Sequence, residues 1–241
     1  MKVGVCQMPD VPGDATRAVG LMRAWSMDAA LHGAALVCFP EGFLQGYGLQ
    51  PGHIARVAIE LASPAFAGIL RELEALEPVI VFGMIETDGG RTYNTAVAIE
   101  RGRIRARYRK AHLLAPEREV FEAGRDCAVF DVGGTRVALN ICHDLAHDES
   151  VRRASEAGAH LLVCPCNNML PRSQAEAWKH RHNEIRCRQA RDHRLWIAAA
   201  EITGERDGCV AYGPTAVIDP GGTVVAQVPL MQIGVVVADI G

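Results

Sequence analysis

Three short segments of the chain each end an apolar run on a side chain that can take part in nucleophilic catalysis. The segment CFPEGF places Glu41 just past a proline, RYRK ends on Lys110, and LNICHD runs through apolar residues to Cys142 before it turns polar. A carboxylate can remove a thiol proton, a thiolate can attack an electrophilic carbon, and an ammonium can stabilise the oxyanion that forms. Together these residue types form a working set for acyl transfer.

Each of the three residues also has a structural interpretation. A cysteine at the end of a β run is often buried core, and Lys110 follows a run of alternating arginines that is typical of a solvated face. Glu41 could simply cap a turn. Catalysis requires a fold that brings these strand ends to one edge, which is where α/β sheets place ligand chemistry.

Short apolar runs alternate with helical patterns along the whole chain, which predicts α/β layers with helices on the outer faces of the sheets. Helices are expected from the Asp14 cap to about Gly33, over about 52–76, from about Asp148, and over about 173–193. The expected strands are KVGVCQM, AALVCFP, PVIVFGMIE, the hairpin DGGRTYNTAVAIE, GRIRARYRK, the pair CAVFDVGGTRVALNIC, AHLLVCPC, LWIAAAE, CVAYG, TAVIDPGGTVVAQV and GVVVADI.

Composition excludes several classes of protein. A chain of 241 residues with 49% hydrophobic content can bury one substantial core, and a net charge of −3 lacks the basic excess of a nucleic-acid binder. No apolar stretch is long enough to span a membrane. The apolar part of the N-terminal segment MKVGVCQMPD is too short for the core of a signal peptide, so a cytoplasmic protein is expected. The 8 cysteines are scattered as free thiols, and Cys164 and Cys166 are too closely spaced for a structural zinc site. We expect neither a metal nor a cofactor.

The motifs in their chain order resemble those of the nitrilase superfamily, the carbon-nitrogen hydrolases. FPEGFLQGY is similar to its glutamate motif, YRKAHLL to its lysine motif and NICHD to its cysteine motif, while EREVFEAG resembles the stretch that carries a second glutamate, here Glu117. The segments GAHLLVCPC, QARDHRLWIAAAE and YGPTAVIDPGG resemble its later elements. The resemblance implies a four-layer αββα sandwich of two mixed β-sheets with outer helices. It also implies a single domain over residues 1–241 and a homo-oligomer, a dimer or larger.

The resemblance assigns a role to each motif residue. Glu41 would take the proton from Cys142, whose ordinary pKa of about 8.5 leaves little thiolate at neutral pH. Lys110 and the backbone N–H of His143 would stabilise the oxyanion, and Glu117 would orient Lys110 or the substrate. A thioester on Cys142 would then be hydrolysed, with a small-molecule amide as substrate.

Departures from the family pattern narrow the expected substrate. His143 and Asp144 after the nucleophile look more like the amidase-like branch than like true nitrilases, and Ala146 stands where many members carry an arginine that grips a carboxylate. A small amide or N-carbamoyl compound is therefore expected rather than an ω-amido acid or a nitrile. Further substrate-binding candidates are Tyr47, Asn167, Asn168 and Trp178, together with His143.

Other functions remain open from the sequence. The chain could be a nitrilase-fold protein that binds a metabolite without turnover, or it could use the same thioester for acyl transfer or nitrile hydrolysis. A Cys-His protease is disfavoured because His143, as the neighbour of Cys142 on a strand, would point to the opposite face. His180 and His182 are expected on the surface of their helix.

Overall fold

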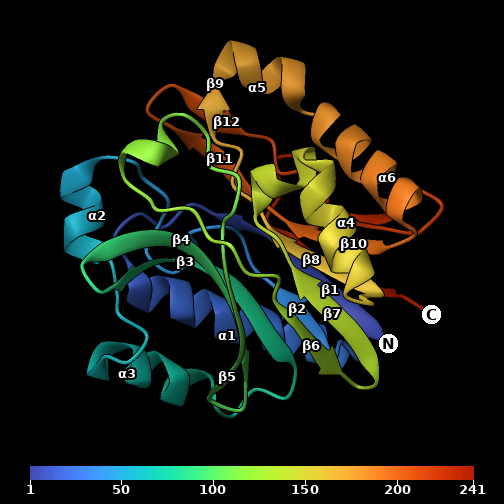
Figure 1. Cartoon of the computed structure of the whole chain (residues 1–241), viewed down its shortest axis with the longest axis horizontal. Coiled ribbons are helices and arrows are strands. Elements are labelled where there is room, and N and C mark those ends of the chain that lie inside the picture. The colour runs from blue at the N-terminus through green and yellow to red at the C-terminus, as the bar shows by residue number, and fades with distance from the viewer.

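The computed structural model describes residues 1–241, and two β-sheets lie at its centre (Figure 1). The first is nine-stranded, in the order β5-β4-β3-β2-β1-β11-β12-β9, with β15 also paired to β1. Its strands are β1 (Lys2–Pro9), β2 (Leu36–Cys38), β3 (Val79–Asp88), β4 (Arg91–Glu100), β5 (Arg103–Arg109), β9 (Leu170–Pro171), β11 (Ile202–Arg206), β12 (Cys209–Ala211) and β15 (Gly234–Asp239).

The second sheet is six-stranded, in the order β14-β13-β10-β8-β7-β6. Its strands are β6 (Val129–Val132), β7 (Thr135–Leu139), β8 (Leu161–Pro165), β10 (Trp196–Ala200), β13 (Ala216–Ile218) and β14 (Val224–Gln227). Both sheets are mixed, because β1, β2 and β3 run parallel, as do β7, β8 and β10, while hairpins add antiparallel strands at the sides.

Helices cover the outer face of each sheet (Figure 1). The helices are α1 (Ala15–Leu31), α2 (Pro51–Val57), α3 (Pro64–Leu73), α4 (Asp148–Glu156), α5 (Arg172–Trp178) and α6 (Arg181–His193), with short 3₁₀ turns η1 (Glu117–Glu119) and η2 (Cys142–Ala146). Of these, α1 and α3 pack on the first sheet and α4 and α6 on the second. The Asp14 side chain caps α1 as predicted, since it accepts a hydrogen bond from the Arg17 N–H. None of the helices combines the length and the apolar character needed to cross a membrane.

Alternating side chains on the strands build the layers. In β1, Val3 and Val5 belong to the cluster between the two sheets, whereas Cys6 faces the helices on the outer side. In β8, Leu161 joins the cluster between the sheets and Leu162 joins the one beneath α4 and α6. Three apolar layers thus separate four structural layers, which confirms the predicted αββα sandwich.

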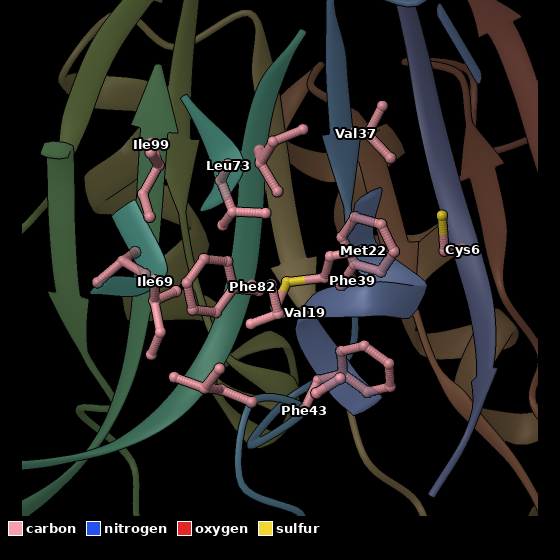
Figure 2. Close-up of a cluster of buried hydrophobic side chains, with 14 of the residues drawn as sticks. Cys6, Val19, Met22, Val37, Phe39, Phe43, Ile69, Leu73, Phe82 and Ile99 are labelled. Atoms are coloured by element: carbon pink, nitrogen blue, oxygen red, sulfur yellow. The ribbon is translucent and has the colours of Figure 1, made fainter. Parts of the chain in front are cut away.

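The outer core beneath α1 and α3 is drawn in Figure 2. Val19 and Met22 of α1 lie beside Ile69 and Leu73 of α3, and Phe82 of β3 packs in the same cluster. These side chains are almost entirely buried. This packing holds β2 and β3 in place, and Glu41 follows directly after β2.

Two predicted helices are each divided in the structure. The stretch 52–76 forms α2 and α3, because Ser63 caps a new helix by accepting a hydrogen bond from the Phe66 N–H and Pro64 occupies its first turn. The stretch 173–193 forms α5 and α6, with the second helix starting where the His180 carbonyl accepts from the Asn183 and Glu184 N–H groups. The short strands β9 and β11 were not predicted.

Candidate active site

The predicted catalytic side chains extend from the carboxyl ends of strands. Glu41 follows β2 in a turn, Lys110 immediately follows β5, and Cys142 opens η2 after β7. Because the parallel strands of both sheets end on the same side, these positions meet although they are far apart in the chain. Glu117 reaches the same place from η1.

A cavity of about 710 Å³ lies at this edge. Every residue that the sequence predicted for the site lines it: Glu41, Tyr47, Lys110, Glu117, Cys142, His143, Asn167, Asn168 and Trp178. The volume falls within the range of small-molecule sites. The structure therefore brings the thiol of Cys142, the ammonium of Lys110 and the two glutamate carboxylates to the wall of one cavity.

Lys110 is held between two carboxylates at the base of the cavity. Its Nζ donates to Glu41 Oε1 at 2.8 Å and to Glu117 Oε1 at 2.7 Å, and the three side chains are at most 1% exposed. Burial alone would lower the pKa of Lys110, but the neighbouring negative groups, Glu41 first among them, raise it above its ordinary value. Lys110 therefore stays a cation.

Glu41 and Glu117 also accept hydrogen bonds from groups other than Lys110. Asn94 of β4 donates from Nδ2 to Glu41 Oε1 at 2.7 Å, the Leu114 N–H donates to Glu117 Oε2 at 2.7 Å, and the Tyr47 hydroxyl donates to Glu117. Burial raises the pKa of Glu41, and the charge of Glu117 adds to this rise while Lys110 opposes it. Glu41 is thus a better proton acceptor than an exposed glutamate.

Cys142 occupies a strained position at the start of η2. Its φ is +43°, in the left-handed region that non-glycine residues seldom adopt. The thiol is half-buried in the cavity wall, and Sγ lies 3.8 Å from Asn168 Oδ1. A hydrogen bond with Cys166 and burial raise the pKa of the Cys142 thiol well above its ordinary value, against the effect of Lys110. The resting thiol is therefore protonated and needs a base.

Gly83 of β3 allows the Glu41 turn to sit against the strand. A Cβ at this position would lie 2.3 Å from the Gly42 nitrogen and 2.5 Å from the Glu41 Cα. The Gly83 N–H also donates to the Pro40 carbonyl at 3.0 Å. Only glycine permits this close approach of two backbones.

Three side chains that the sequence analysis missed support the site from behind. Asn94 holds Glu41 as described, and buried Glu201 accepts hydrogen bonds from Arg186 and, at 2.5 Å, from Asn168 Nδ2. That contact turns Asn168 Oδ1 toward Cys142. Glu201 ends the apolar segment LWIAAAE, so the same pattern of a polar residue after a buried strand could have identified it.

The predicted orientation of His143 away from Cys142 and the predicted surface position of His182 are wrong, although His143 lines the cavity as its substrate-binding prediction required. Because Cys142 opens a 3₁₀ turn and not a continued strand, His143 does not point away but lines the cavity, with its Nε2 3.2 Å from His147 Nε2. His182 is not on the surface either, because the division between α5 and α6 places it in the cavity wall. Burial and the charge of Arg186 lower the pKa of His182 to about 3, so its ring is neutral. His180 is exposed, as expected.

No group of three or more His, Cys, Asp or Glu side chains is placed to hold a metal ion. The thiols of Cys164 and Cys166 lie 3.6 Å apart and are buried.

Comparisons with known proteins agree with this geometry. A family model described as carbon-nitrogen hydrolase matches residues 2–241. An (R)-stereoselective amidase from Pseudomonas sp is 28% identical over 94% of this chain and 80% of its own length. Omega-amidase NIT2 from Bos taurus is 29% identical over 88% of this chain and 77% of its own.

The fold also matches solved structures. An amidase from Nesterenkonia sp. superimposes with a TM-score of 0.85 at 24% identity, over 100% of this chain and 90% of that one. Because the family model spans almost every residue and the relatives align over most of their length, the chain belongs to the carbon-nitrogen hydrolase family, within the nitrilase superfamily.

Proposed function

We propose that the protein hydrolyses the C–N bond of a small amide or N-carbamoyl compound through a thioester on Cys142, with release of ammonia or an amine. The observation that supports this most strongly is the buried cluster in which Lys110 is bound by both Glu41 and Glu117, in the wall of the cavity that also holds the thiol. A buried ion cluster of this kind is poorly explained by stability alone, because the desolvation of three charges offsets most of their attraction.

The first half-reaction follows from the positions of these groups. Glu41 takes the thiol proton as Cys142 Sγ bonds to the carbonyl carbon, and the carbonyl electrons move to oxygen. Lys110 and the His143 N–H stabilise that oxyanion. The C–N bond then breaks, the nitrogen takes the proton from Glu41, and ammonia or an amine leaves a thioester on Cys142.

The second half-reaction returns the thiol. Glu41, again unprotonated, accepts a proton from water as the water oxygen attacks the thioester carbon. The C–S bond breaks, the acid leaves, and the proton returns to Cys142. Glu117 acts through Lys110, since its Oε1 holds Nζ in place at 2.7 Å.

The orientation of Asn168 favours amides over nitriles. Its Nδ2 donates to Glu201, so its carbonyl oxygen faces the thiol at 3.8 Å. An oxygen acceptor at this place can receive a hydrogen bond from the N–H₂ group of an amide, whereas a nitrile nitrogen has no proton to donate.

Ammonia release from a panel of aliphatic amides, N-carbamoyl amines and nitriles tests the proposal. We expect turnover of at least one amide or carbamoyl compound and a loss of at least about 10³-fold in kcat/KM in Cys142→Ala. Cys127→Ala is the matched control, because that thiol is exposed and outside the cavity. Undiminished turnover in Cys142→Ala would refute the mechanism, and binding without turnover by the wild type would favour a metabolite-binding protein.

A further inference from the structure

Apolar side chains line part of the cavity. Leu49 and Leu114 come from loops, and Trp178 and Ile185 come from α5 and α6. The Trp178 ring lies 5.3 Å from the His182 ring, centroid to centroid, so the two form one aromatic surface. A two-carbon amide would fill only a small part of a cavity of about 710 Å³.

Each cation that lines the cavity already has an acidic partner. Lys110 is bound by its two carboxylates. The Arg186 guanidinium is buried, pairs with Glu201 and donates to the Pro214 carbonyl at 2.8 Å. Arg206 pairs with Asp10, and its Nη2 donates to the Tyr47 carbonyl at 3.3 Å.

The two histidines of the wall add no positive charge near neutral pH. Burial lowers the pKa of His143, and the charges of His147 and Lys110 lower it further. The pKa of His182 is lowered to about 3, chiefly by burial. No lining cation is therefore free to receive a carboxylate, and two carboxylates against one ammonium at the base of the cavity repel a further anion.

We infer that the substrate is a small-molecule amide whose apolar acyl group extends beyond two carbons, packs against the aromatic surface of Trp178 and His182, and carries no carboxylate. This inference rests on the proposed function and specifies its substrate. A carboxylate bound in this cavity would have to displace an acidic partner from Lys110, Arg186 or Arg206, or remain without a cation, and both are unfavourable.

Pairs of primary amides with equal chain length test the inference. One member ends in a methyl group and the other in a carboxylate, and kcat/KM is measured from ammonia release. We expect the neutral member to be preferred by at least about 10²-fold, as for a site that leaves a polar group unpaired. Equal rates, or a preference for the carboxylate, would overturn the substrate class while leaving the hydrolase intact. Failure of every amide and N-carbamoyl compound to react or to acylate Cys142 would instead overturn the proposed function, and the inference with it.

Ala146 provides a second test, because it is exposed and yet lines the cavity. Ala146→Arg adds a cation without an acidic partner. It should raise the ratio of kcat/KM for the carboxylate amide to kcat/KM for the neutral amide by at least about tenfold. The control is Ala146→Gln, which adds a long polar side chain without charge. An unchanged ratio would contradict the claim that a missing free cation excludes carboxylates.

The aromatic surface is tested separately with Trp178→Ala. We expect KM to rise at least about tenfold for phenyl-substituted or long-chain amides while propionamide changes less than about threefold. A uniform loss on all substrates would show that Trp178 supports folding and does not contact the acyl group. Retention of full activity on large amides would likewise overturn its role.

Discussion

Lys110→Met removes the charge that holds Glu41 and Glu117 together while it keeps a side chain of similar length. Nζ lies 2.8 Å and 2.7 Å from the two carboxylate oxygens, and none of the three side chains is more than 1% exposed. As a guide, two unit charges about 4 Å apart repel by about 4 kcal/mol at an effective dielectric constant of about 20. Breaking a buried ion pair at one partner typically destabilises a protein by about 3–5 kcal/mol.

Proton uptake limits this destabilisation and makes it depend on pH. The pKa of Glu41 is already raised by burial, and the loss of Lys110 raises it further. Neutralising a carboxyl group whose ordinary pKa is about 4.3 costs about 5 kcal/mol at pH 8 but only about 2.3 kcal/mol at pH 6. Because the folded pKa is the raised one, the variant loses stability as pH increases through it. We expect a loss of about 3–5 kcal/mol at pH 8 and of no more than about 2.3 kcal/mol at pH 6.

Urea unfolding of wild type and variant at both pH values measures the effect. Lys2→Met is the control, since Lys2 is exposed and its loss should change the unfolding free energy by less than about 0.5 kcal/mol. A loss below about 1 kcal/mol in Lys110→Met at pH 8, or one that is equal at both pH values, would refute the electrostatic account of the cluster.

Three other predictions follow from the same geometry. Because Glu41 must be unprotonated to act as a base and its pKa is raised, kcat/KM should fall with decreasing pH at an acid limb above the ordinary value of about 4.3; a limb at or below that value contradicts this role. Gly83→Ala should lower the free energy of unfolding, measured in urea, by at least about 2 kcal/mol because its Cβ would clash with the Glu41 turn. Gly52→Ala in α2, where no atom lies near the added Cβ, should be neutral or slightly stabilising, and equal effects of the two changes would contradict the close approach. Glu201→Gln should destabilise the protein by about 3 kcal/mol because it leaves Arg186 buried without a counter-charge, and a change below about 1 kcal/mol would show that solvent reaches that guanidinium.

Local sequence patterns made the residues at the strand ends candidates, and the resemblance of the three motifs then assigned them a shared role. Glu41, Lys110 and Cys142 each follow a run of apolar or alternating residues, and the change in polarity marks where a strand leaves the core. Parallel strands then bring such ends together. The resemblance of the motifs added the second glutamate, Glu117, whose own segment has no strand before it.

Residues that act through distant partners could not be found in this way. Asn94 lies within β4 and contacts Glu41, which is far from it in sequence and belongs to another element. The inward position of His143 depends on one positive φ at Cys142, which no propensity of a short apolar run predicts. The chain breaks between α5 and α6 at Lys179 and His180, where no proline or glycine marks the end of a helix.

The proposed mechanism requires Cys142 to carry the acyl group during turnover. Mass spectrometry of the intact protein, quenched in acid during steady-state reaction with a neutral amide and followed by peptide mapping, tests it directly. We expect a mass increase equal to the acyl group, located on Cys142 and absent in Cys142→Ala. Turnover with Cys142 unmodified, or an acyl group found on a different cysteine, would contradict it.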